Sequence, residues 1–277
     1  MSAVYTRESL TFELSRLSSA PRIVPKLAAL VKDPNMNPED VIEVIRHDPA
    51  LTARLIAACK SAAVNRGEEV HSVIDAVQCL GFTEVYRIAV VVAFRSGFCG
   101  RFQVYDESAD IIWQRAVAAA CFMEEFALEG EDDLGAAFTT GMLYMIGMFF
   151  VDWHCAQLPG VRIPTRNLLR QVEMERTRAG FGHMEISAMA LEYWGFPTDI
   201  VEPIRWYLEP DKAGGHTKSA RQLNFAVNLA QDQAASRVRA VFANRNRPVT
   251  TPAGNPLPPI IDKVGRRTAD AMEFLRH

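Results

Sequence analysis

The six histidines are the residues of this chain best suited to metal-dependent chemistry: His47, His71, His154, His183, His216 and His277. A hydrolytic metal site needs three or four converging ligands, and residues on a helix share a face only when they are three or four apart. The one His-Asp dipeptide is His47-Asp48, but Asp48 precedes Pro49 and is better placed to cap a helix. Asp152 with His154 and His183 with Glu185 are two residues apart. The spacing therefore predicts no metal ligands, and no cofactor is expected.

Motifs for nucleophilic or phosphate chemistry are absent from the sequence. It contains no G-x-S-x-G, no P-loop and no G-x-G-x-x-G. Cys59 precedes Lys60, but adjacent residues of a helix do not face each other, so Cys59 is interpreted as a core residue. The five cysteines form no C-x-x-C pair, and the first residues are too polar for a signal peptide. We expect a cytoplasmic protein with reduced thiols and no catalytic residue.

Charge is distributed unevenly. Residues 1–210 carry 19 Lys and Arg against 28 Asp and Glu, whereas residues 211–277 carry 11 against 5. The basic C-terminal segment is interpreted as a solvated face, which could also attract an acidic surface of the same protein or a phosphate-rich partner. Nucleic-acid binding would use Arg237, Arg239, Arg245 and Arg247, near which only Phe242 could stack on bases. Nucleic acid is therefore not the expected partner.

Helical periodicity with capping residues covers most of the chain. Ser72 and Asp75 form a capping-box pattern, and Gly81 is placed to end the helix that they begin. No segment alternates polar and apolar residues for long enough to predict a strand. We therefore predict an all-α fold.

A glycine-containing break at residues 97–105 divides the chain into two packed helical lobes. The N-terminal lobe is residues 1–100, and an HD-like lobe with a basic C-terminal extension is residues 101–277. In the second lobe, one helix is expected to begin at about Ser108, and others are expected at 134–151, 183–194 and 198–208. A helix of about 25 residues then reaches Arg239, and the last helix is Ile261–Leu275. The proline-rich stretch 244–259 is predicted to be a loop.

The uncharged run from Leu134 to Val151 contains G-M-L-Y-M-I-G-M at 141–148. Its length reaches the lower limit for a membrane span. However, it includes two threonines and a tyrosine, and no Lys or Arg flanks it to set a topology. We interpret it as a central buried helix, in which the small residues at 137 and 141 allow neighbouring helices to approach closely. No membrane span is expected.

The order of several motifs resembles the HDOD family, bacterial signalling domains related to the HD superfamily of metal-dependent phosphohydrolases. The resemblance rests on P-R-I-V-P at 21–25, D-P-A-L-T at 48–52, the S-x-x-x-A-x-x-x-L-G pattern at 72–81, Ile112-Trp113-Gln114-Arg115, and the G-F-G-H and Y-W-G-F-P segments within 180–197. Lys60 stands where the family has Asn. The match extends over roughly residues 18–235, as a single HDOD domain.

The same resemblance implies that most metal ligands of the HD superfamily are replaced. G-M-L-Y-M-I-G-M resembles that superfamily's G-L-L-H-D-I-G-K. The replacements are Tyr144 and Met145 at the His-Asp pair, Met148 at the Lys, Arg115 at the upstream His, Tyr207 and Leu208 near the later His-His pair, and Gln231 near the closing Asp. Among the ligand positions of the superfamily, the resemblance implies that only the one at His183 keeps its histidine.

The resemblance implies a non-catalytic bacterial signal-transduction and regulatory module that binds a signalling protein partner. A residual pocket lined by Arg115, Tyr144, His183, Tyr207 and Gln231 could also take a small anionic or nucleotide ligand. Arg115 could hold the anion, or it could pair with an acid such as Glu185. The alternatives are a phosphohydrolase with rearranged ligands, His183 with Glu185 or Glu209, and nucleic-acid binding through the basic segment.

Overall fold

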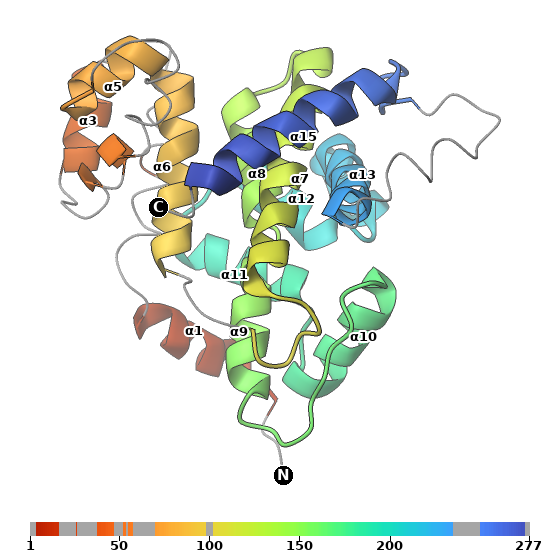
Figure 1. Ribbon diagram of the computed structural model, residues 1–277. Helices are drawn as coiled ribbons and strands as arrows, with labels where there is room; N and C mark the ends of the chain where they lie inside the picture. Colours follow the sequence, from red (N-terminus) through yellow and green to blue (C-terminus); the bar gives the residue numbers. More distant parts are fainter. Residues whose placement is uncertain are drawn as a thin grey trace. The chain divides into compact units, whose positions relative to one another are not determined.

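In the computed structural model (Figure 1), the structure describes residues 4–16, 26, 38–46, 52–53, 55–57, 70–97, 102–234 and 250–274. Their α-helices are α1 (Arg7–Arg16), α3 (Pro38–Arg46), α5 (Val73–Leu80), α6 (Phe82–Gly97), α7 (Ala109–Gly130), α8 (Leu134–Leu143), α9 (Ile146–Cys155), α10 (Leu168–Ala179), α11 (His183–Tyr193), α12 (Thr198–Trp206), α13 (Thr217–Ala234) and α15 (Leu257–Phe274). Two short 3-10 turns, Pro210–Lys212 and Gly214–His216, precede α13. These residues contain isolated β-bridges but no strand, so the predicted all-α fold is confirmed.

The helices form two compact units. One comprises Met1–Arg16 with Gly100–Met272, and the other comprises Leu17–Cys99 with Glu273–His277. The two predicted lobes, residues 1–100 and 101–277, are each continuous in the sequence, whereas each observed unit combines two separate segments. The division into those two domains stays a prediction. The N-terminal segment belongs with the larger unit, because α1 packs against α11 and the backbone N–H of Tyr5, just before α1, donates to the Ala179 carbonyl at 2.9 Å.

In the smaller unit, α5 begins and ends as its sequence predicts. The Ser72 hydroxyl accepts from the Asp75 backbone N–H at 3.1 Å, and the Asp75 carboxylate accepts from the Ser72 backbone N–H at 2.9 Å. Gly81 then ends the helix with a φ of 78°, which glycine adopts without strain. The D-P-A-L-T motif at 48–52 lies mostly outside the described residues.

In the larger unit, α7 packs against α8 and α13, and α11 packs against α9 and α12. The contact between α7 and α8 depends on Gly141, where a Cβ atom would lie 2.5 Å from the Ala120 Cα. The expected close approach of helices at position 141 is therefore confirmed. A side chain there would push the two backbones apart.

The single helix predicted for 134–151 is wrong, because the structure has two helices, α8 and α9, with a turn at Tyr144–Met145. Ser187 of α11 explains how the turn is stabilised. Its hydroxyl donates to the Tyr144 carbonyl and accepts from the Gly147 N–H, both at 2.8 Å. Backbone groups that an unbroken helix would pair internally are thus paired by a side chain from another element, which the local sequence cannot reveal.

The segment Leu134–Cys155 is long and apolar enough to cross a membrane by length and composition alone. Within the structure, however, 72% of its most apolar window is buried. Its two threonine hydroxyls donate to carbonyls one turn earlier, at 2.7 and 2.8 Å. Such extensive burial is what the interpretation as a central core segment requires.

The last helix differs from the prediction at its start. The helix α15 begins at Leu257 rather than Ile261, because Pro258 and Pro259 fit its first turn, where the missing N–H groups cost nothing. The loop predicted for 244–259 is therefore shorter, and its residues 244–249 lie outside the described part. The helix α13 is described as far as Ala234. The helix α10 was not predicted.

Candidate functional site

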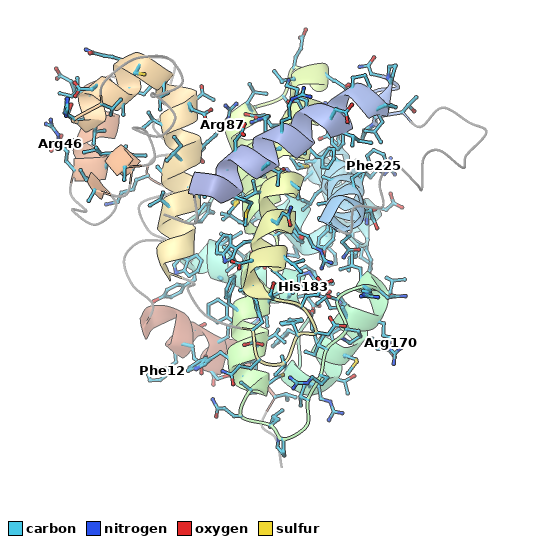
Figure 2. All side chains as sticks on the ribbon, viewed as in Figure 1. Phe12, Arg46, Arg87, Arg170, His183 and Phe225 are labelled. Atoms are coloured by element: carbon cyan, nitrogen blue, oxygen red, sulfur yellow. The ribbon has the colours of Figure 1, made fainter. Side chains whose placement is uncertain are left out.

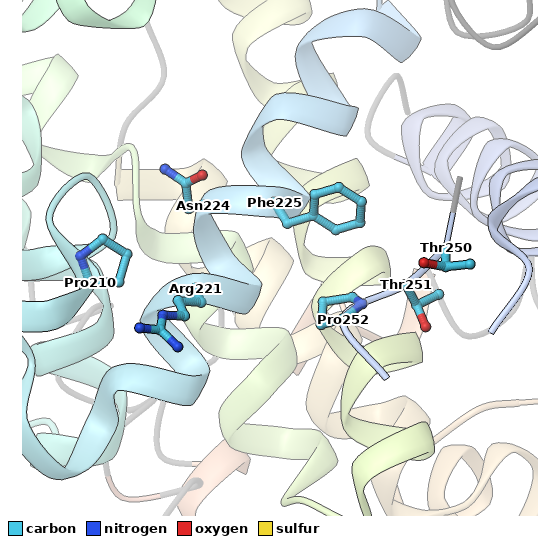
Figure 3. A pocket seen from close by; sticks show the side chains of 7 residues that line it. All are labelled: Pro210, Arg221, Asn224, Phe225, Thr250, Thr251 and Pro252. Carbon is cyan, nitrogen blue, oxygen red and sulfur yellow. The ribbon is translucent and has the colours of Figure 1, made fainter. Parts of the chain in front are cut away.

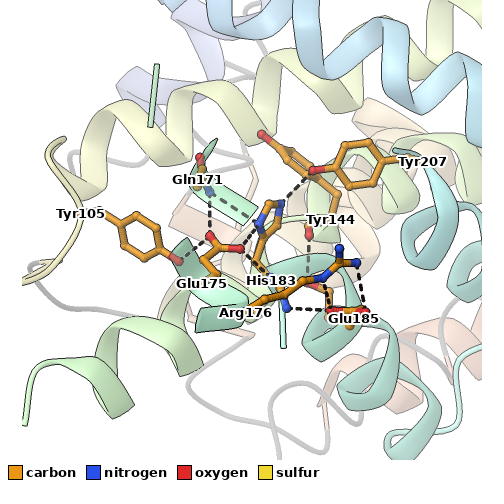
Figure 4. A network of polar contacts seen from close by, with 11 residues as sticks. Tyr105, Tyr144, Gln171, Glu175, Arg176, His183, Glu185 and Tyr207 are labelled. Atoms are coloured by element: carbon orange, nitrogen blue, oxygen red, sulfur yellow. Dashed lines mark hydrogen bonds and ion pairs between the residues drawn. The ribbon is translucent and has the colours of Figure 1, made fainter. Parts of the chain in front are cut away.

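His183, the first residue of α11, is fully buried at the centre of a polar network (Figures 2 and 4). Its Nδ1 lies 2.7 Å from Glu175 Oε2, and its Nε2 lies 2.8 Å from the Tyr207 hydroxyl. Its backbone N–H also donates to Glu175 Oε2 at 2.8 Å. Both ring nitrogens are therefore engaged by side chains of the same chain.

Glu175 is the acceptor at the other end of this network. Its Oε1 accepts from the Tyr105 hydroxyl and from Gln171 Nε2, both at 2.8 Å. Burial acts to raise the pKa of Glu175, but the charge and hydrogen bonds of His183 and the bond from Gln171 outweigh it, so the pKa lies below its usual value. The carboxylate is ionised and can only accept, and His183 Nδ1 must therefore carry a proton.

The tyrosines around the network are neutral. Burial raises the pKa of Tyr105 and of Tyr207 well above the usual value. Burial also raises the pKa of Tyr144 to about 12, although Arg115 acts to lower it. The Tyr144 ring meets those of His183 and Tyr207 edge-on, with centroids 6.4 and 5.9 Å away. The centre of the unit is thus filled by packed aromatic rings whose polar atoms are mostly bonded to one another.

Sequence reasoning missed Glu175, Gln171 and Tyr105. The first two lie on α10, which begins at Asn167, whose side chain accepts from the Arg170 N–H at 3.0 Å, and ends at Gly180. In the sequence, Gln171, Val172, Glu175 and Ala179 recur at the spacing of one helix face, and in the structure all four are buried. An acid on the buried face of a helix requires a partner, and here the partner is His183.

Arg115 is buried and pairs with an acid that the sequence did not suggest. Its Nη1 lies 2.5 Å from Glu107 Oε2, an ion-pair distance without the angles of a hydrogen bond, and its Nε has no hydrogen-bond partner. The alternative in which Arg115 pairs with an acid is therefore confirmed, but the acid is Glu107 and not Glu185. Glu185 instead accepts two bonds of 3.1 Å from Arg176 and one of 2.7 Å from the Gly182 N–H. It therefore serves the start of α11.

Four of the five predicted pocket residues gather in one region. The rings of Tyr144, His183 and Tyr207 contact one another, and Arg115 lies close enough to Tyr144 to act to lower its pKa. Gln231 lies near the end of α13 and is half-buried. Within the described residues, no hydrogen bond joins Gln231 to the other four. The function of this region as a ligand pocket stays a prediction.

The residues present do not fit the metal centre of the HD superfamily. A metal-bound histidine must offer a free nitrogen lone pair. Because Nδ1 donates its proton to Glu175, only Nε2 of His183 has a lone pair, and the Tyr207 hydroxyl occupies it. Throughout the described ranges, no group of three or more His, Cys, Asp or Glu side chains is arranged to hold a metal ion. Tyr144 and Tyr207 contribute neutral hydroxyls where charged or imidazole ligands would be needed.

An open pocket of about 320 Å³ lies away from this network, between α13 and residues 250–252 (Figure 3). It is lined by Pro210, Arg221, Asn224, Phe225, Thr250, Thr251 and Pro252. Arg221 is largely exposed and lies 2.6 Å from Asp211. The arginines considered for nucleic-acid binding, at 237, 239, 245 and 247, fall in a stretch that the structure does not describe.

Comparison with known families identifies the class of this protein. The HDOD domain family matches residues 17–210. The match includes the network of Glu175, His183 and Tyr207. The chain belongs to the HDOD domain family, as the sequence motifs predicted. No curated protein matches the chain.

Solved structures share the fold. A candidate phosphohydrolase from Shewanella amazonensis SB2B is 22% identical with a TM-score of 0.69, covering 98% of this chain and 97% of that one. A candidate signal transduction protein from Marinobacter aquaeolei VT8 is 22% identical with a TM-score of 0.74, and this chain spans 62% of its length while 99% of this chain is covered. An HDOD domain protein of unknown function from Geobacter sulfurreducens is 17% identical with a TM-score of 0.61, covering 98% and 92%. At these identities the likeness establishes the common fold alone.

Proposed function

We propose that this chain is a non-catalytic signal-transduction module that acts by binding a protein partner. The observation that carries the proposal is the closed state of His183, whose two ring nitrogens are bonded to Glu175 and Tyr207. A phosphohydrolase of the HD type would need that imidazole to face a metal ion and a bound water. Here it serves to hold α10, α11 and the end of α12 together.

The replacements around His183 support the same conclusion. Tyr144 and Tyr207 are neutral phenols, and Met145 and Met148 offer only weak sulfur acceptors. Arg115 brings a positive charge to a place where a cation would have to bind. No residue in this set can generate hydroxide or act as a general base near neutral pH.

A small anionic ligand at Arg115 is a narrower part of the proposal. The Arg115 Nε is buried without a hydrogen-bond partner, and the Tyr144 ring lies close enough for the charge of Arg115 to act on its hydroxyl. Such a ligand would have to replace Glu107, which already pairs with the guanidinium. An anion should therefore bind more tightly to a Glu107→Gln variant than to the wild-type chain.

Hydrolysis assays test the non-catalytic proposal. The wild-type chain and His183→Ala are incubated with a phosphodiester such as bis-p-nitrophenyl phosphate, and with nucleoside monophosphates, in the presence of Mg²⁺, Mn²⁺ or Zn²⁺. We expect equal background rates for the two chains. A rate that depends on an added metal and falls in His183→Ala would reject the proposal in favour of a phosphohydrolase with rearranged ligands.

A further inference from the structure

The outer face of α7 carries two neighbouring carboxylates that are buried beneath α15. Glu124 and Glu125 have side chains 1% and 7% exposed. Buried carboxylates are strongly unfavourable unless cations compensate them. The cations come from α15, which runs across α7 in Figure 1.

Two residues of α15, four apart and hence on one face, supply these cations. Lys263 Nζ lies 2.7 Å from Glu125 Oε2, and Arg267 Nη1 lies 3.1 Å from Glu125 Oε1. Arg267 also pairs with Glu124 through its other terminal nitrogen. Burial acts to lower the pKa of Arg267, but Cys121, Glu124 and Glu125 outweigh it and hold that pKa above its usual value.

The apolar part of the contact is a narrow stripe on α15. Leu257 and Val264 are buried apolar side chains seven residues apart, and the polar Thr268 is buried one turn further on, whereas Arg266 on the same helix is exposed. The cations remain partly solvated, since the side chains of Lys263 and Arg267 are 50% and 27% exposed. Without α15, the two buried carboxylates would lose these cations, whereas Lys263 and Arg267 are already partly solvated by water.

The buried carboxylates need two cations at the right spacing, and any helix that carries such cations could supply them. The family match ends at residue 210, so α15 lies outside the matched range. We propose that the Glu124–Glu125 face of α7 is a binding surface for a basic amphipathic helix of a protein partner, and that α15 occupies it within the chain. The partner helix would carry two cations four residues apart beside an apolar stripe.

The proposal rests on the proposed function, since it names a surface for the protein partner. If this surface binds no such helix, only the proposal of this surface fails. The hydrolysis assays test the non-catalytic function independently. The carboxylates also exclude other classes of partner, because an acidic face repels nucleic acids and anionic membranes.

A peptide that competes with α15 tests the proposal. A fluorescent peptide of residues 257–274 is titrated with the full-length wild-type chain and with full-length Lys263→Glu/Arg267→Glu, whose own α15 cannot pair with the acids. Fluorescence anisotropy should show binding to the double variant that is roughly tenfold or more tighter than to the wild type, where α15 competes. The binding should weaken as salt is raised.

Matched peptides show whether the ion pairs are responsible. A peptide with Arg267→Glu should lose binding, whereas one with Arg266→Glu, the same charge change on the exposed side, should retain it. Equal binding of these two peptides would overturn the proposal. So would equal binding of the unaltered peptide to the wild-type and doubly substituted chains.

A second measurement applies if the double variant fails to fold. Cys121 lies on α7 close enough to Arg267 to raise its pKa, and both Cys121 and Cys155 are buried. In the wild-type chain, displacement of α15 by high salt should accelerate alkylation of Cys121 while Cys155 remains protected, as followed by mass spectrometry. Protection of both cysteines at all salt concentrations would contradict a displaceable α15.

Discussion

At the scale of single residues, the His183 network is a buried polar cluster in which each member constrains the next. Glu175 accepts from His183, Tyr105 and Gln171, and His183 is held in turn by Tyr207. A cluster of this kind specifies one arrangement of the surrounding helices, because any other arrangement leaves a buried polar atom without a partner. Its members join α10, α11, the end of α12 and the loop before α7.

Removal of the Tyr207 hydroxyl should expose this dependence. In Tyr207→Phe, His183 Nε2 keeps its burial but loses its partner, and we expect a loss of about 1–3 kcal/mol in the free energy of unfolding. Urea denaturation followed by circular dichroism measures it. Tyr193→Phe is the control, because Tyr193 is 40% exposed and should change stability by less than about 0.5 kcal/mol. Equal stability of the two variants would show that the hydroxyl is dispensable.

The low pKa of Glu175 predicts a pH dependence. Because folding lowers this pKa, the stability that Glu175 contributes is complete above its ordinary value of 4.5 and is lost as the pH falls through the folded value. The free energy of unfolding should therefore fall below about pH 4.5 more steeply in the wild type than in Glu175→Gln. Burial raises the pKa of Asp152, which acts in the opposite direction, but it does so in both proteins and cancels in the comparison. Parallel pH profiles would contradict the account.

At the scale of helices, the glycines of the apolar segment set how closely its neighbours approach. A Cβ atom on Gly147 would lie 2.0 Å from the His183 carbonyl oxygen, so α9 and α11 meet at the residue that begins the network. The turn between α8 and α9 is fixed by Ser187 from the same helix, α11. The position of His183 is therefore determined by contacts of α11 with α9 as well as by its own hydrogen bonds.

Substitution of Gly147 tests this dependence. Gly147→Ala must shift a helix backbone, and we expect a loss of about 1–3 kcal/mol in unfolding free energy. Gly215→Ala is the matched control, because nothing lies within 4 Å of its added Cβ. Thermal melting of both variants decides the matter. If Gly147→Ala melts at the same temperature as Gly215→Ala, the close contact does not constrain the fold.

The helices also show how far the sequence could lead. The capping pattern was sufficient to predict α5, because Ser72, Asp75 and Gly81 lie in the helix or directly next to it. The break between α8 and α9 could not be predicted, since Ser187 lies some 40 residues along the chain. Glu175 and its partner His183 are likewise on different helices. The family resemblance identified Tyr144, His183 and Tyr207, but only the tertiary structure reveals which side chains bond to them.

At the scale of the whole molecule, the apolar segment Leu134–Cys155 is part of a core. Because most of its apolar window is covered by other parts of the chain, we expect the purified protein to stay in the aqueous phase in a detergent phase-separation experiment. Transfer to the detergent phase would mean that this segment is available to lipid. That result would contradict its place between α7, α11 and α12.

The central claim for the whole molecule is that this HDOD domain holds His183 in hydrogen bonds to Glu175 and Tyr207 of the same chain rather than at a metal. The most direct test is elemental mass spectrometry of untagged protein purified without chelators. We predict a ratio of transition metal to protein close to zero, unchanged in His183→Ala. One or more ions per chain, lost in His183→Ala, would contradict the account.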